Sequence, residues 1–401
     1  MKNNLKQAFY IGSGFLLGQG SMFAVQTYLV AQQQFSLISA VGIFLGILTL
    51  FQGVADGGGI FLLSKYRSEN LQNQYFYAFL LARVLFTSFF LALLYLISFF
   101  VTYEHWKFLL IFVAVNSFIW VFNINGILDF EKLNKKLIYT SSINWLIASI
   151  ILYFFDKNQK IIELIGFGFS FGTLINVISQ YLIVRKINIS LFQVNPTYKN
   201  VEMQLKVICA HGFGYIAAQG YGRLLPIFTN YYLSSTLAGY CIYAKSLASA
   251  IGQLVIFTRR ADYGRLVELV NKEEWNIKSI LKVQQVGIYI SFVAFLISIF
   301  FYLLFTINNS NIVIANMCLG MIFLNILWSM VHAVSMSIVA LGMNSGYSFS
   351  IVASSIVGIL LLMLLLRFNN LYYILIIELI VYLFQIIISL YFLKLAKMKN
   401  G

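Results

Sequence analysis

Charged residues are scarce in this chain of 401 residues, since Asp, Glu, Lys and Arg together make up only 10% of it. Soluble domains usually carry about 25%. Hydrophobic residues make up 60% of the chain, and the mean hydropathy is +0.85. A soluble protein could not cover its surface with so few polar side chains. The composition therefore excludes a soluble domain and predicts a membrane protein.

Cysteine is also rare. Cys209, Cys241 and Cys318 each lie inside an apolar run. An odd number of thiols in such surroundings does not indicate a disulfide framework, so we interpret them as small packing residues. We expect no metal site, no catalytic residue and no cofactor.

Long stretches without charge indicate helices that cross the membrane. No charged residue occurs between Lys6 and Asp56, which leaves room for two spans of about 20 residues each. The strands of a membrane barrel would be short and alternating, whereas these runs are long and continuously apolar. The sequence predicts an all-α polytopic membrane protein with about twelve transmembrane helices. The expected spans cover residues 9–31, 37–63, 75–101, 106–128, 137–155, 161–184, 205–231, 237–258, 283–306, 312–340, 347–366 and 371–393.

Lysine and arginine are distributed unevenly over the loops between these spans. Of the 27, twenty fall on one face of the membrane, four on the other face and three within spans. Short loops rich in Lys and Arg stay in the cytoplasm, so this asymmetry predicts that both termini are cytoplasmic. The net charge of +14 then reflects topology and contact with anionic lipids, and a nucleic-acid partner is not expected.

The chain divides into two halves of six predicted helices. Residues 191–204 form a cytoplasmic linker between an N-terminal lobe, residues 1–190, and a C-terminal lobe, residues 205–401. Short similarities, such as residues 40–42 with residues 237–239, indicate that the halves are repeats. A repeat of six helices keeps its orientation, so we expect a pseudo-two-fold axis along the membrane normal.

Four stretches of the chain carry a resemblance to a known family. They are Gly12–Gln19 in the first predicted helix, Ser39–Lys65 in the second, Trp120–Lys136 at the end of the fourth, and Leu237–Arg260 in the second half. In these stretches, and in helix number, the chain resembles the polysaccharide flippase branch of the multidrug/oligosaccharidyl-lipid/polysaccharide (MOP) exporter superfamily, the O-antigen-unit flippases in particular. The resemblance implies two six-helix lobes around a cavity that opens alternately to either side of the membrane.

The same resemblance implies a function and its setting. The substrate would be a polyprenyl-pyrophosphate-linked oligosaccharide, an O-antigen or capsule repeat unit, moved from the cytoplasmic to the periplasmic leaflet of a bacterial inner membrane. Membrane lipids and other polysaccharide-assembly proteins would be partners of a monomeric flippase in lipopolysaccharide biosynthesis. A proton or sodium gradient or the membrane potential would drive export, since moving one charge across 100 mV is worth about 2.3 kcal/mol.

Ionisable residues inside the predicted spans mark candidate functional positions. A charge at bilayer depth costs on the order of 2.5–3.5 kcal/mol, so such residues usually face a cavity or a partner. Five positions qualify, and they are Asp56, Arg83, Arg223, Lys245 and Glu378.

Asp56 and Arg83 are expected at the same depth, on helices joined by a short cytoplasmic loop, so the sequence predicts that they form an ion pair. Two interpretations stay open. The pair neutralises itself while Gly57, Gly58 and Gly59 allow close helix packing. Alternatively Asp56 releases Arg83 to a phosphate of the substrate, and the glycines let the second helix bend.

Arg223 and Lys245 lie at similar outer depth on adjacent predicted helices, neither of which carries an acid that can pair with them. This pattern indicates an anion site, because the forked Arg side chain matches phosphate or sugar-acid oxygens. Pro226, three residues after Arg223, would loosen the helix there. Snorkelling of both side chains to the outer interface is the alternative.

Three further residues are candidates for gating or coupling. Glu378 on the last predicted helix could pair with Lys245 or Arg223, or carry a proton. His211 and His332 lie in apolar runs, where a histidine is either a satisfied core residue or a proton relay.

Two other functions remain as alternatives at this point. A multidrug exporter of the same superfamily would need buried carboxylates for cationic drugs, whereas the charged residues within these spans are mostly basic. A membrane-embedded glycan polymerase would need acids or arginines on a sizeable outer loop. The predicted outer loops are short, and their only acids are Glu104, Asp156 and Glu163.

Overall fold

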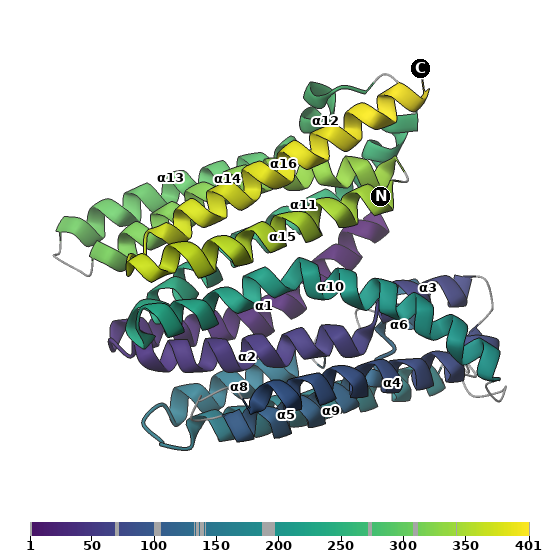
Figure 1. Cartoon of the computed structure of the whole chain (residues 1–401), viewed down its shortest axis with the longest axis horizontal. Coiled ribbons are helices and arrows are strands. Elements are labelled where there is room, and N and C mark those ends of the chain that lie inside the picture. The colour runs from purple at the N-terminus through teal and green to yellow at the C-terminus, as the bar shows by residue number, and fades with distance from the viewer. Residues whose placement is uncertain are drawn as a thin grey trace. The chain divides into compact units, whose positions relative to one another are not determined.

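The computed structural model shows an all-α protein (Figure 1), without a strand in the part of the chain that it describes. The described residues are 2–68, 72–99, 106–131, 133, 136, 140, 142–186, 197–271, 275–307, 312–341 and 343–400.

Contacts divide the chain into two compact units. The first consists of Met1–Tyr28 and Ala40–Gln219, and the second of Leu29–Ser39 and Gly220–Gly401. Three helices contribute residues to both units, and they are α1 (Lys2–Ala31), α2 (Phe35–Asp56) and α10 (Tyr198–Tyr232).

Among the described residues, six further helices belong to the first unit. These are α3 (Gly59–Ser68), α4 (Gln72–Ser98), α5 (Trp106–Val121), α6 (Asn125–Phe130), α8 (Ile143–Phe154) and α9 (Ile161–Lys186). Helix α5 packs against both α4 and α9, and the three lie side by side in Figure 1. A β-carbon on Gly172 of α9 would lie 2.4 Å from Asn144 Cα of α8. Glycine at this position therefore allows the two helices to approach closely.

The second unit is completed by α11 to α16. Its elements are α11 (Ser235–Asn271), α12 (Ile277–Val283), α13 (Gln285–Ile307), α14 (Ile312–Ala340), α15 (Asn344–Leu365), the short 3₁₀ helix η1 (Leu366–Phe368) and α16 (Tyr373–Asn400). Helix α14 packs against α11, α13 and α16, and α15 packs against α16 (Figure 1).

Each of the twelve predicted spans coincides with one described helix or with two helices in succession. Seven of the described helices are long and apolar enough to cross a membrane, and α5 and α8 are shorter apolar helices. These findings confirm the prediction of an all-α polytopic membrane fold. They follow from the long uncharged runs, because a helix satisfies its own backbone hydrogen bonds in lipid.

Two spans differ from the prediction because they are broken. The span expected at residues 37–63 consists of α2 and α3, and the span expected at 106–128 consists of α5 and α6. Apolar residues flank both breaks, which contain Asp56 with Gly57–Gly59 in the first and Asn123 with Asn125 in the second, so hydropathy averaged over a whole span does not show them. Both breaks adjoin the core of the first unit, where Phe79, Leu63 and Ile124 are fully buried.

Candidate functional site

Four of the five ionisable residues within the spans form two ion pairs, one in each unit. Asp56 Oδ1 lies 3.2 Å from Arg83 Nη2 in the first unit. Glu378 Oε1 lies 2.6 Å from Lys245 Nζ in the second. The predicted ion pair between Asp56 and Arg83 is present, and Glu378 pairs with Lys245, which was one of its two expected partners.

Helix α2 ends at Asp56 because the next two residues are left-handed. The φ angles of Gly57 and Gly58 are +53° and +78°, values that a side chain disfavours. The amide of Gly57 still donates to Gly53 O and Val54 O, which closes the last turn. The carbonyl of Ala55 accepts no intrahelical bond there and instead accepts from Arg83 Nε at 2.8 Å. The expected bend at the glycines is thus a complete helix stop.

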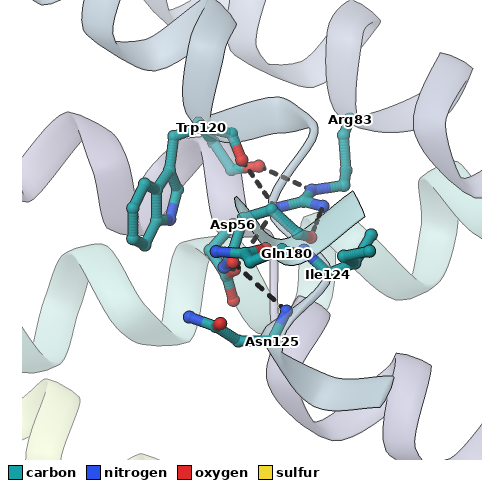
Figure 2. A network of polar contacts seen from close by, with 8 residues as sticks. Asp56, Arg83, Trp120, Ile124, Asn125 and Gln180 are labelled. Carbon is teal, nitrogen blue, oxygen red and sulfur yellow. Dashed lines mark hydrogen bonds and ion pairs between the residues drawn. The ribbon is translucent and has the colours of Figure 1, made fainter. Parts of the chain in front are cut away.

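Helix α5 stops at the same guanidinium. It ends at Val121, and α6 begins at Asn125. The carbonyl of Trp120 accepts from Arg83 Nη2 at 3.2 Å, and the carbonyl of Asn123 accepts from Arg83 Nη1 at 2.9 Å. Figure 2 shows these bonds converging on one side chain. A single arginine therefore binds carbonyls at the ends of two helices.

The surroundings of Arg83 explain how a charge is kept at this depth. Its side chain is 0% exposed, and its guanidinium lies 5.3 Å from the centroid of the Phe79 ring. The C-terminal ends of helices carry partial negative charge, so α2, α5 and the Asp56 carboxylate all favour the cation. Four hydrogen bonds engage its donors. In this conformation Arg83 joins two helix breaks and has no surface for a ligand.

Asn123 and Gln180 complete this network. Asn123 Nδ2 donates to Asp56 Oδ1 at 2.8 Å, and its Oδ1 accepts from the amide of Asn125 at 3.2 Å. Gln180 Oε1, from α9, accepts from the amide of Ile124 at 2.7 Å (Figure 2). Sequence reasoning missed both residues. The Asn125-Gly126 dipeptide in the middle of an apolar run was the available signal, since Asn-Gly marks turns.

A second group of buried polar residues lies between α2, α5 and α9. Gln52 Nε2 donates to Asn116 Oδ1 at 2.7 Å and to Thr173 Oγ1 at 3.3 Å, and Asn116 Nδ2 donates to Ser170 Oγ at 3.4 Å. Ser170, Thr173 and Gln180 recur at helical spacing, so one face of α9 is polar and buried. These bonds join three spans, as is typical of polar residues between membrane helices.

The pair in the second unit has a different environment. Lys245 of α11 lies 5.1 Å from the centroid of the Tyr221 ring of α10, and its acid partner Glu378 belongs to α16. The side chain of Glu378 is 2% exposed, whereas that of Lys245 is 25% exposed. The carboxylate and the ring that contact Lys245 are side-chain groups, in contrast to the backbone carbonyls around Arg83. The Lys245 side chain is therefore partly exposed, and the groups that hold it are side chains.

The other predicted residues are placed as follows. Arg223 is half-buried on α10, two residues after Tyr221, and Pro226 lies inside the same helix. His332 of α14 is half-buried, with its ring 5.2 Å from that of Trp328. His211 belongs to α10, but its side chain lies outside those that the structure describes. The roles predicted for these residues stay predictions. No group of His, Cys, Asp and Glu among the described residues could hold a metal ion.

Comparisons with known proteins identify the fold. No protein-family model and no curated protein sequence matches the chain. Several solved structures do match. A lipid II flippase, MurJ, in an inward closed conformation has a TM-score of 0.66 and 13% identity, over 93% of this chain and 87% of that one. A MATE protein in its straight conformation has a TM-score of 0.67 and 12% identity, over 99% and 95% of the two chains.

A third similar structure is a MOP superfamily transporter from Pyrococcus furiosus, described by the reverse polarity of its binding pocket. Its TM-score is 0.62 at 11% identity, over 99% of this chain and 95% of that one. Identities this low carry information about architecture only. The chain has the fold that MurJ shares with MATE and other MOP superfamily transporters.

Proposed function

We propose that the chain belongs to the MOP superfamily and is a flippase. It would move a polyprenyl-pyrophosphate-linked oligosaccharide, an O-antigen or capsule repeat unit, from the cytoplasmic to the periplasmic leaflet by alternating access. The fold supports transport over catalysis, because the similar structures include a lipid II flippase and multidrug transporters. The setting in this proposal is a bacterial inner membrane with both termini in the cytoplasm.

The charge balance of the spans carries the choice of an anionic substrate. Arg83, Arg223 and Lys245 are basic, whereas Asp56 and Glu378 are the only acids among the five positions. Each acid forms an ion pair with a base, so no surplus of negative charge exists at these positions for a cationic drug. A pyrophosphate group is negatively charged, and Lys and Arg bind its oxygens well.

The geometry distinguishes between the three cations as substrate ligands. Lys245 is partly exposed and held by one carboxylate, so an incoming phosphate could compete with Glu378 for it. Arg223 belongs to α10, the helix that also supplies Tyr221 to the Lys245 site. Arg83 would have to break four hydrogen bonds before it could bind a phosphate. We therefore propose Lys245 and Arg223 as the first ligands of the headgroup.

Glu378 would act as the gating residue of this site. When the site is empty, Glu378 neutralises Lys245 at a separation of 2.6 Å. When a phosphate binds Lys245, the displaced carboxylate becomes free to take up a proton or a sodium ion. Export of negative charge from a negative interior also gains about 2.3 kcal/mol per charge per 100 mV. The membrane potential therefore contributes to the driving force in either case.

Complementation tests this proposal. The chain is expressed in a bacterium that lacks its own O-antigen flippase, and surface glycan is measured. We expect Arg223→Ala and Lys245→Ala each to abolish glycan export without lowering membrane abundance. Arg367→Ala is the matched control, because Arg367 is an exposed arginine in η1. Export that survives both substitutions would exclude these residues from the mechanism.

A multidrug exporter is the second candidate, because the similar structures include multidrug resistance MATE family transporters. The same cells separate the two functions. Drug resistance without restored glycan would support the exporter, and restored glycan without drug resistance would support the flippase. A MATE-like fold alone favours neither a lipid-linked oligosaccharide nor a drug as the substrate.

A further inference from the structure

A groove lies on the first unit between α5 and α9. Its volume is about 590 Å³, and its lining includes Phe118, Phe122, Leu174, Ile178, Leu182 and Arg185. This volume is within the range of about 300–1,000 Å³ that is usual for small-molecule sites. The groove shares none of its lining residues with the Lys245 site.

The groove lies beside the last turns of α5, close to the break in the fourth predicted span. Helix α5 ends at Val121, whereas α9 continues for its full length to Lys186. Gly166 of α9 lies against Phe112 of α5, so the two helices are in close contact at the start of α9. Beyond the end of α5, the amide of Ile124 donates to Gln180 Oε1 of α9, and α6 also contacts α9. The groove lies between the last turns of α5, at Phe118 and Ile119, and residues 174–185 of α9.

The walls of the groove match hydrocarbon. Phe118 is 40% exposed, Ile178 is 49% exposed and Leu182 is 54% exposed. In a chain that spans the membrane, apolar side chains this exposed face lipid. The groove therefore opens toward the bilayer, where an acyl chain can enter it from the side.

Arg185 closes one end of the groove with a positive charge. It is exposed, lies in the last turn of α9 and, in the part of the chain that the structure describes, forms no ion pair. Leu174 marks the opposite end. Leu174 and Arg185 are eleven positions apart in α9, which corresponds to a rise of about 16 Å at about 1.5 Å per residue. One leaflet of the hydrocarbon core is about 15 Å deep, half of the total thickness.

We infer that this groove binds one acyl chain of an anionic phospholipid of the cytoplasmic leaflet, with the phosphate on Arg185. The apolar walls match the chain, the length matches one leaflet, and the single cation lies where the headgroup of that leaflet would be. A polyprenyl tail fits less well, because it is much longer than a groove of one leaflet. This inference concerns a structural lipid and does not depend on what the protein transports.

Equilibrium binding of phosphatidylglycerol to the purified full-length protein tests the inference, with native mass spectrometry to count retained lipids. We expect one phosphatidylglycerol on the wild type and weaker binding of phosphatidylcholine. Arg185→Gln should weaken phosphatidylglycerol binding about five-fold, the effect of about one basic residue near the surface. Ile178→Trp should abolish binding, since the indole fills the groove.

Two control variants separate a site from general attraction. Lys186→Gln removes an equal charge next to Arg185, but Lys186 does not line the groove. Phe167→Trp places an indole on the same helix, at a side chain that is 65% exposed and outside the groove. Both variants should bind phosphatidylglycerol like the wild type. Thermal unfolding of each variant shows whether it folds. If Arg185→Gln does not fold, the comparison of Ile178→Trp with Phe167→Trp still tests the inference.

Three results would overturn the inference. Equal weakening by Lys186→Gln and Arg185→Gln would show diffuse attraction to the cytoplasmic end of α9. Binding by Ile178→Trp at wild-type affinity would show that the lipid lies elsewhere. Undecaprenyl phosphate and unlabelled phosphatidylglycerol can each be used to displace bound phosphatidylglycerol. If undecaprenyl phosphate does so at the lower concentration, the groove binds a polyprenyl tail. A failure of glycan export in cells would leave all three measurements unaffected.

Discussion

Replacement of Arg83 tests whether this residue is a structural connector or a ligand for the substrate. Arg83→Leu removes the guanidinium and keeps an apolar side chain in the core around Phe79. Three backbone carbonyls, those of Ala55, Trp120 and Asn123, then lose a donor. The Asp56 carboxylate loses its partner cation as well. We expect a large loss of stability, because the two helix ends and one acid become unsatisfied together.

The magnitude can be worked out from these contacts. Removing one member of a buried ion pair costs about 3–5 kcal/mol, because the other charge is left alone. Hydrogen bonds between membrane helices contribute about 0.6 kcal/mol each on average, so three carbonyls add about 2 kcal/mol. Asp56 is 13% exposed, so the ion-pair contribution is taken at the lower end of this range, about 3 kcal/mol. The sum is about 5 kcal/mol, a large fraction of the stability of a typical protein.

Thermal unfolding in detergent, followed with a thiol-reactive dye, measures this loss. Cys241 is buried and Cys209 and Cys318 are half-buried, so unfolding exposes thiols that the folded protein shields. The double variant Arg83→Leu with Asp56→Asn should recover the ion-pair part of the loss, about 3 kcal/mol, but not the carbonyl part. Arg83→Lys should be intermediate, since it keeps the charge and has fewer directed donors.

An unchanged unfolding temperature for Arg83→Leu, combined with loss of transport, would refute this reasoning. Such a result would mean that Arg83 acts on the substrate, as in the hypothesis that Asp56 releases it to a phosphate. The opposite result, loss of stability with residual transport in Arg83→Lys, would support a structural role. The two readings of the Asp56 and Arg83 pair therefore predict different measurements.

Two smaller changes test other parts of the first unit by the same unfolding assay. Gly57→Ala should destabilise by about 1–2 kcal/mol, because φ there is +53° and the new methyl group would lie 2.7 Å from Ile208 Cγ2. Gly220→Ala, where no atom lies within 4 Å, should be close to neutral, and equal effects at both sites would contradict the argument. Gln52→Leu should cost about 1 kcal/mol through its lost bond to Asn116, and an increase in stability would show that this polar contact is dispensable for folding.

The positions of the spans could be predicted from the sequence because the membrane imposes a simple rule. Long uncharged runs must be helical in lipid, and each expected span has a helix in the structure. The ion pair of Asp56 and Arg83 was also predictable, since the helical rise gives both residues the same depth. Arguments of this kind use only side-chain polarity and distance along the chain.

The break between α5 and α6 could not be predicted in the same way, because its cause lies in the backbone. The groups that Arg83 binds at Trp120 and Asn123 are carbonyls, which every residue has. Sequence reasoning therefore named Asp56 as the partner of Arg83 and missed most of its acceptors.

The two ion pairs show why a charge within a span is an ambiguous sign of function. Arg83 is fully buried and bonded mostly to backbone carbonyls, which cannot move without unfolding two helix ends. Lys245 is partly exposed, and a side-chain carboxylate and a ring are the groups that hold it. A side-chain partner can change rotamer and leave the cation to a ligand, whereas a backbone partner is fixed by the fold. The nature of the acceptor, more than the depth of the charge, therefore separates a connector such as Arg83 from a candidate ligand such as Lys245.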